Sequence, residues 1–184
     1  MDVLISRQRI DEAVGRLAGE IRRDYAAGPP VLVGVLYGAF VFLADLARAL
    51  ELPVEIGFVG LSSYGVGTVS SGRMEVFHDL RIDIAGRDVV LVEDIVDSGH
   101  SVTYLYDYLR QRRPASLRLC CLLDKPARRQ VPVAIDYRGF TIPNLFIVGY
   151  GMDFNGQYRH LPDIRVLKEA PTPPLPARAE SRAR

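Results

Sequence analysis

The sequence predicts an α/β fold in which a parallel central sheet is flanked by helices. Apolar runs that suit buried strands alternate along the chain with segments of helical periodicity, and this alternation is typical of parallel sheets. With 184 residues and 48% hydrophobic content, the chain can bury one substantial core. We therefore expect a single domain over residues 1–170. Residues 171–184 are rich in Pro and Arg and lack apolar periodicity, so we expect a disordered tail there, with a weak electrostatic contact as the alternative.

The expected elements follow from apolar spacing. We expect a helix over about residues 7–25, because apolar side chains recur there at helical spacing before Gly28 and two prolines end the pattern. A buried strand at 31–36 is then followed by a helix at 39–50. The other expected strands are 54–61, 89–92, 117–123, 131–135 and 145–148, with a helix after residue 101. Ligands bind at the carboxyl ends of parallel strands, so the turns after these strands are expected to converge on one site.

Charge and cysteine usage exclude several classes of function. A net charge of +1 does not suggest a nucleic-acid partner. The N-terminus lacks the pattern of a signal peptide, and the uncharged run at 31–44 is too short to span a bilayer, so no membrane partner is expected. Cys120 and Cys121 are adjacent in an expected strand and therefore point to opposite faces. We expect two buried free thiols in a cytoplasmic, reducing compartment.

The most informative segment is 89–101. Two carboxylates, Glu93 and Asp94, follow the apolar run 89–92, and Asp97 precedes a Ser-Gly-His-Ser loop that opens a helix. Such a loop offers backbone N–H groups and the positive end of a helix dipole to a phosphate. The carboxylates would repel that phosphate, so they suit ligand hydroxyls or a bridging Mg²⁺. The alternative is a structural turn in which Asp97 or Ser98 caps the helix, but a cap explains one polar residue and not five.

This segment resembles the phosphoribosyl pyrophosphate (PRPP) motif of the type I phosphoribosyltransferases, and the resemblance runs from about Ile5 to Leu167. It implies a sheet domain with a small hood and a flexible lid loop. In this family the acidic pair Glu93 and Asp94 would face the ribose hydroxyls and their metal, and Asp97 would take the N7 proton of the base. The loop that would hold the 5′-phosphate consists of Asp97, Ser98, Gly99, His100 and Ser101.

Lys125 is one of only two lysines among the 23 basic residues, which suggests a site where a compact ammonium fits and a planar guanidinium does not. From composition alone it could equally be a surface charge. Lys125 follows the expected strand 117–123 and so lies at the carboxyl edge of the sheet. Its position matches a lysine of the purine-specific branch of the family. In that branch the lysine hydrogen-bonds the exocyclic oxygen at C6 of the purine. That contact would select hypoxanthine and guanine over adenine.

The segment 143–159 also resembles this branch. Taken alone, Phe146 lies in an apolar run and would more often be core. The resemblance implies that Phe146 stacks on the purine and that the backbone of Ile147 binds the edge of the base. It also implies that Asp153 is associated with a second Mg²⁺ and that Arg159 meets pyrophosphate; the spacing of these two residues indicates no chemistry by itself.

Two loops complete the predicted site. Residues 62–72 are rich in glycine and hydroxyls, and an isolated loop of this kind is more often a hairpin connection. The resemblance instead matches Ser63 and Tyr64 to the Ser-Tyr pair of a catalytic lid, which would exclude water. The chain reads Leu36-Tyr37-Gly38 where the family usually has Leu-Lys-Gly, a pyrophosphate loop that can hold a cis peptide. Tyr37 removes a positive charge, so we expect altered pyrophosphate affinity or subunit coupling.

These observations predict a purine-salvage enzyme that uses Mg²⁺ and transfers the phosphoribosyl group of PRPP to hypoxanthine or guanine. The partners are then small molecules, and the family implies a homodimer or homotetramer. Two alternatives remain open. One is a PRPP-sensing regulator without catalysis, which the Tyr37 departure permits. The other is a phosphoribosyltransferase that acts on xanthine or adenine.

Overall fold

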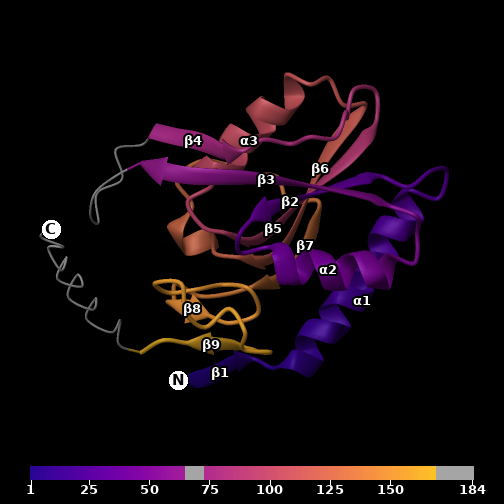
Figure 1. Ribbon diagram of the computed structural model, residues 1–184. Coiled ribbons are helices and arrows are strands. Elements are labelled where there is room, and N and C mark those ends of the chain that lie inside the picture. The colour runs from indigo at the N-terminus through magenta and orange to yellow at the C-terminus, as the bar shows by residue number, and fades with distance from the viewer. Residues whose placement is uncertain (65–72, 169–184) are drawn as a thin grey trace, which may run out of the picture.

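The computed structural model describes residues 1–64 and 73–168, which form a six-stranded sheet, a three-stranded sheet and the helices around them (Figure 1). The helices are α1 (Arg7–Asp24), α2 (Phe40–Leu50), α3 (His100–Arg110) and the 3₁₀ turn η1 (Pro126–Arg128). The strands are β1 (Asp2–Ile5), β2 (Val31–Leu36), β3 (Glu55–Tyr64), β4 (Arg73–His78), β5 (Asp88–Val96), β6 (Ser116–Asp124), β7 (Tyr137–Thr141), β8 (Ile147–Val148) and β9 (Ile164–Val166).

The larger sheet has the strand order β4-β3-β2-β5-β6-β7 and is parallel except for β4, which pairs antiparallel with β3. Strands β2, β5 and β6 are buried on both faces, as their apolar runs predict. Helices α1 and α2 pack on one face, and α3 covers the other (Figure 1). Cys120 and Cys121 are free and fully buried, one in each of these two core layers, which confirms the predicted thiols.

The connections of the larger sheet diverge at its middle. After β2 the chain crosses through α2 to β3 on one side, whereas after β5 it crosses through α3 to β6 on the other. Strand β2 pairs with β5 only as far as Val92, so the last residues of β5 have β6 as their sole neighbour in the described pairing. Such a point, where strand order reverses, is where ligands bind in open α/β sheets.

The smaller sheet forms the hood that the resemblance implies. Strand β9 lies between β1 and β8 and is antiparallel to both. The N-terminal strand β1 therefore lies beside residues 164–166, far from it in sequence, at the lower edge of Figure 1. This arrangement brings the predicted base-binding segment to the carboxyl ends of the central strands.

Several expected elements differ from the observed ones. The predicted strand at 131–135 is wrong, because the N–H groups of Gln130 and Val131 both bond to Ser98 O and Pro132 has no N–H, so this segment cannot join the ladder. The strand next to β6 is instead β7, which the apolar pattern did not reveal. Strand β5 extends beyond residue 92, because pairing with β6 continues to Val96. Strands β1, β4 and β9 were not predicted.

The hairpin alternative for residues 62–72 matches the antiparallel pairing of β3 with β4. Residues 65–72 and the side chains of Ser63 and Tyr64 lie outside the described part of the chain, so the lid stays a prediction, as does the state of residues 169–184. No helix among the described residues has both the length and the hydropathy to cross a membrane.

Candidate active site

Two adjacent carboxylates lie near the end of β5, where β2 no longer pairs with it. Glu93 and Asp94 are both buried, and Glu93 Oε2 has no hydrogen-bond partner. Burial raises the pKa of both carboxyl groups above their ordinary values, and the neighbouring Asp94 charge raises the pKa of Glu93 further. Buried carboxylates with an unpaired oxygen suit a divalent cation, whose charge would stabilise their ionised forms.

Gly38, in the turn between β2 and α2, packs directly against this acidic pair. A Cβ atom at Gly38 would lie 2.5 Å from Asp94 Cγ and 2.8 Å from its Oδ1, well inside ordinary contact. Only glycine therefore lets the turn approach the carboxylate so closely. The Leu36–Tyr37 peptide bond is cis, a form that the resemblance allows for this loop.

The predicted phosphate loop connects β5 to α3. Gly99 adopts φ +93°, a conformation that favours glycine, and a Cβ there would also lie 2.8 Å from Val131 O. Asp97 Oδ1 is buried and lies 3.2 Å from Arg128 Nε, although not in hydrogen-bonding geometry. The His100 ring bonds to Gln130 Oε1 at 2.9 Å, so the side chain of His100 is directed to that neighbour. No side chain caps α3, which makes the simple capping alternative wrong.

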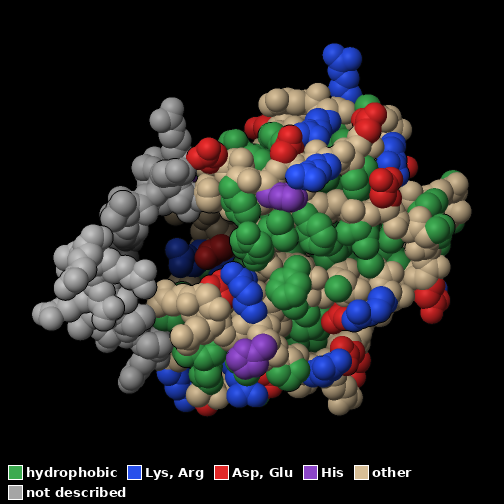
Figure 2. Space-filling view, viewed as in Figure 1, with side chains coloured by type: hydrophobic (Ala, Val, Ile, Leu, Met, Phe, Trp, Pro, Cys, Tyr) green, Lys and Arg blue, Asp and Glu red, His purple; other side chains and the backbone are tan. Residues whose placement is uncertain are grey.

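Two adjoining cavities contain most of the predicted site residues, and they share Gly38 and Asp94. Figure 2 shows acidic and basic side chains at the bottom of a hollow on the left of the molecule. The cavity on the acidic side measures about 190 Å³ and includes Glu93 and Ser101. The larger one measures about 310 Å³, and its polar and aromatic lining comprises Tyr37, Asp97, Lys125, Phe146, Asp153 and Arg159, with Ile147 beside them.

Lys125 is only 6% exposed, so the surface-charge alternative is wrong. It follows β6 directly and lines the larger cavity together with Asp97. Burial lowers the pKa of the Lys125 ammonium, and the nearby Asp97 charge opposes that effect. A buried ammonium beside a carboxylate can donate a hydrogen bond to a ligand oxygen in this cavity.

Phe146, one of the two aromatic residues that line the larger cavity, is 50% exposed, so the alternative that it belongs to the core is wrong. Its ring forms a T-shaped contact with the ring of Phe154, with centroids 5.3 Å apart and an interplanar angle of 89°. Ile147 is buried in β8 immediately beside it. Phe154 was not predicted, because an isolated aromatic in a loop carries no signal of the partner that it contacts.

Asp153 and Arg159 form an ion pair, with Asp153 Oδ1 2.7 Å from Arg159 Nη2. Asp153 Oδ2 accepts from Gly156 N at 2.7 Å, and Arg159 Nη1 donates to Gly151 O at 2.6 Å. Both oxygens of Asp153 therefore have protein partners, and the guanidinium is held from two sides. The structure supplies the physical link between these two residues that their spacing in the sequence did not reveal.

Tyr37 links this guanidinium to the β3–β4 hairpin. The Tyr37 ring stacks on Phe77 of β4, with centroids 5.6 Å apart, and the Arg159 guanidinium carbon lies 6.0 Å from the Tyr37 centroid. Tyr37 is nevertheless 59% exposed. The aromatic ring thus occupies the position of the usual lysine and contacts a cation, whereas a lysine would add a second positive charge there.

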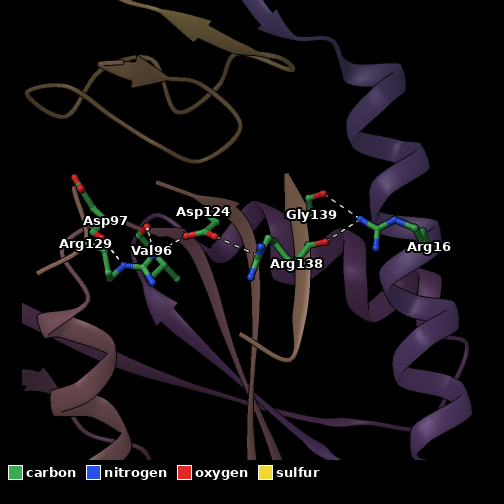
Figure 3. Close-up of polar contacts among 7 residues, drawn as sticks. All are labelled: Arg16, Val96, Asp97, Asp124, Arg129, Arg138 and Gly139. Atoms are coloured by element: carbon green, nitrogen blue, oxygen red, sulfur yellow. Dashed lines mark hydrogen bonds and ion pairs between the residues drawn. The ribbon is translucent and has the colours of Figure 1, made fainter. Parts of the chain in front are cut away.

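A further set of charges behind the site was missed by sequence reasoning. Asp124, buried at the end of β6, pairs with Arg129 and with Arg138 (Figure 3). Arg129 also donates to the backbone of Val96 and Asp97. The chain has many arginines, so nothing in the sequence distinguishes these two from surface residues.

Comparison with known proteins decides the family. The family model of the phosphoribosyl transferase domain matches residues 5–155. This chain belongs to that family. The phosphoribosyltransferase match covers the central sheet, the acidic pair and the loop 97–101, so the resemblance drawn from the PRPP motif is confirmed.

Individual relatives show which members of the family this chain is similar to. A hypoxanthine-guanine phosphoribosyltransferase of Streptococcus pneumoniae is 45% identical over 167 residues, covering 91% of this chain and 93% of the relative. A crystal structure of a hypoxanthine-guanine phosphoribosyltransferase from Bacillus anthracis aligns with a TM-score of 0.86 at 43% identity, covering 91% of this chain and 98% of that one. A bifunctional TilS/HprT protein of Listeria innocua is 45% identical over 166 residues; these cover 90% of this chain and only 26% of that relative.

Proposed function

We propose that this phosphoribosyltransferase acts in purine salvage: it transfers the 5-phosphoribosyl group of PRPP to N9 of hypoxanthine or guanine, which yields IMP or GMP and pyrophosphate. The observation that carries the proposal is the pair of adjoining cavities, one acidic and one containing a buried lysine and an exposed aromatic. A donor and an acceptor bound in these cavities would meet at Gly38 and Asp94, which line both. Holding two reactants in one geometry lowers the barrier strongly.

On the donor side, Glu93 and Asp94 would accept hydrogen bonds from the ribose hydroxyls, and the loop 97–101 would bind the 5′-phosphate. Gly99 and the N-terminal end of α3 suit an anion, because unpaired backbone N–H groups point out of such a turn. Arg159, held by Asp153 and Gly151, would meet the pyrophosphate. A cation fixed in advance stabilises the negative charge that develops on the leaving group.

On the acceptor side, Asp97 would take the proton from N7 while Lys125 donates a hydrogen bond to O6. The two side chains line the same cavity, and Lys125 is buried, so its contact with a base would be shielded from water. Phe146 would stack on the purine plane, and the Ile147 backbone would bind the edge of the base. The exocyclic amino group of adenine cannot accept the Lys125 hydrogen bond, which favours the oxopurines.

The donor set of the site fits Mg²⁺. Among the described residues, no three His, Cys, Asp or Glu side chains cluster to hold a metal by themselves. The two carboxylates Glu93 and Asp94 would therefore hold the ion together with oxygens of PRPP, which is the usual arrangement for Mg²⁺ at phosphorylated substrates. When bound, Mg²⁺ neutralises charge on the departing pyrophosphate. A second ion near Asp153 remains part of the proposal, although both oxygens of Asp153 have protein partners here.

The proposal is tested by incubating the purified protein with PRPP, Mg²⁺ and each of four bases: hypoxanthine, guanine, xanthine and adenine. We expect nucleotide from hypoxanthine or guanine, detected by chromatography and by the change in ultraviolet absorbance. Product from xanthine or adenine alone would instead establish the alternative acceptor. No product with any base, together with measurable binding of PRPP, would establish the sensor.

Two further properties belong to the proposal. The free, buried thiols of Cys120 and Cys121 suit a cytoplasmic location, where thiols stay reduced. A homodimer or homotetramer is what the family implies. The exposed aromatic residues Tyr37, Phe40 and Phe77 offer apolar surface for such contacts, and light scattering of the purified protein would measure the assembly.

A further inference from the structure

Three consecutive carbonyl groups, at the last residue of β5 and in the loop that follows it, are all bonded to one segment, residues 125–131. The acceptors are the backbone oxygens of Val96, Asp97 and Ser98. Since a trans peptide places its N–H opposite its C=O, the N–H groups of residues 97, 98 and 99 point away from that segment. The donors are the backbone N–H groups of Lys125, Gln130 and Val131 and the side chain of Arg129.

This orientation is the one that an anion-binding loop needs. Successive N–H groups that point the same way form a concave site for a phosphate, whereas a carbonyl turned into that site would repel it. The direction of three N–H groups is therefore set by whatever holds the three carbonyl groups. In the segment 125–131, one side chain donates hydrogen bonds to these carbonyl groups.

That side chain is Arg129, whose guanidinium joins three groups. Its Nε donates to Asp97 O at 2.9 Å, and its Nη2 donates to Val96 O at 3.1 Å and contacts Asp124 Oδ1 at 2.5 Å. The Arg129 side chain is 17% exposed and that of Asp124 is 6% exposed, so water competes little with these bonds. A planar guanidinium with five donors can bridge two carbonyls and a carboxylate at once, which an ammonium cannot do in this geometry.

Asp124 has a second partner that serves as a natural control. Arg138 of β7 lies 3.3 Å from Asp124 Oδ2, on the side away from the loop (Figure 3). The side chain of Arg138 has no hydrogen bond to residues 96–98 among the described contacts. Arg129 and Arg138 thus share one buried counter-ion, and Arg129 alone of the two also holds the loop.

We propose that Arg129 is a positioning residue that orients the loop 97–101 for the 5′-phosphate of PRPP, with Asp124 anchoring its guanidinium. The inference rests on the proposed function, because it deepens the donor side of the same site. Arg129 acts through the Val96 and Asp97 carbonyls and does not contact the reacting atoms.

The test compares Arg129→Met with Arg138→Met. Each change removes one of the two cations from Asp124. The Arg138 side chain is 49% exposed against 17% for Arg129, so Arg138→Met should cost less stability, and thermal melting measures that cost in both variants. We expect Arg129→Met to raise the KM for PRPP and the inhibition constant of ribose 5-phosphate by about 10- to 100-fold, the effect of losing charge-assisted hydrogen bonds. The KM for the purine should change by less than about threefold, and Arg138→Met should leave all three constants within that margin.

Hydrogen exchange provides a readout that needs no turnover. In the unliganded protein, Arg129→Met should speed exchange of the amides of residues 97–104, whereas Arg138→Met should not. If the wild type makes no nucleotide with any base, the proposed function fails, but this comparison still decides the role of Arg129. Equal losses of PRPP affinity in the two variants, or unchanged exchange in Arg129→Met, would overturn the inference.

A conservative variant covers the case in which Arg129→Met does not fold. Arg129→Lys keeps the charge beside Asp124 but can reach fewer of the three acceptors, so we expect a rise in the KM for PRPP of about 3- to 10-fold. A KM equal to that of the wild type would show that charge alone is needed at this position, and the bridging role of the guanidinium would be wrong.

Discussion

Replacing Gly38 by alanine tests the close contact between the first turn of the site and its acidic pair. A Cβ at this position would lie 2.5 Å from Asp94 Cγ, whereas ordinary contact begins at 3.4 Å, so the turn and the carboxylate would have to separate by about 1 Å. Such overpacking costs about 1–3 kcal/mol of stability. A displacement of about 1 Å in a reacting site can lower turnover by about 100-fold. We therefore expect kcat/KM for PRPP to fall by roughly that factor.

The assay follows nucleotide formation by ultraviolet absorbance at varied PRPP concentration, with thermal melting in parallel. Gly15→Ala is the matched control, because a Cβ at Gly15 of α1 meets nothing within 4 Å. Alanine in a helix interior should stabilise the protein by about 0.5–1 kcal/mol and leave activity unchanged. If Gly38→Ala retained wild-type kcat/KM, the packing of this turn against Asp94 would not determine donor geometry, and the reasoning would be refuted.

Four further predictions concern the acceptor side, the metal and the core. Asp97→Asn should lower kcat by about 10²- to 10⁴-fold with little change in PRPP affinity, as expected for a general base; turnover close to wild type would exclude that role. Lys125→Met should lower kcat/KM for hypoxanthine by about 10- to 100-fold. It should also reduce the preference of the enzyme for hypoxanthine over adenine, which is measured as the ratio of kcat/KM for the two bases. EDTA should abolish product formation and added Mg²⁺ should restore it, whereas full activity after chelation would argue against the metal. Leu46→Ala, in the fully buried face of α2, should cost about 2–5 kcal/mol in urea unfolding, and a smaller loss would mean that the core relaxes around the cavity.

The acidic pair and the loop of the proposed donor side could be singled out from the sequence because these residues are nearly contiguous. The acids at 93 and 94 and the loop 97–101 lie on one strand and the turn that follows it, so local pattern and chemistry suffice. The central strands were also predictable, since burial on both faces requires an uninterrupted apolar run. The edge strand β7 could not be predicted in this way, because it is partly exposed and has no uninterrupted run of apolar residues.

What could not be predicted depends on partners that are distant in the chain. The stack of Tyr37 on Phe77 joins residues 40 positions apart, and local periodicity contains no information about such a contact. Arg129 donates its hydrogen bonds to the backbone oxygens of Val96 and Asp97. Every residue has such an oxygen, so no sequence pattern identifies these acceptors. The residues proposed to bind the base came from the resemblance to a family, because spacing alone would not have selected them.

The strand order of the hood determines when each half of the site can be completed during synthesis. Strand β1 is made first, but its one partner within residues 1–64 and 73–168 is β9, about 160 residues later in the chain. Ile147 of β8 also pairs with β9, at Val166. The strand pairing of the larger sheet, by contrast, is complete once β7 has been made. A nascent chain can therefore form the acidic pair and the loop 97–101 while the ribosome is still producing the hood, whereas Arg159 and the wall beside the proposed base site come last.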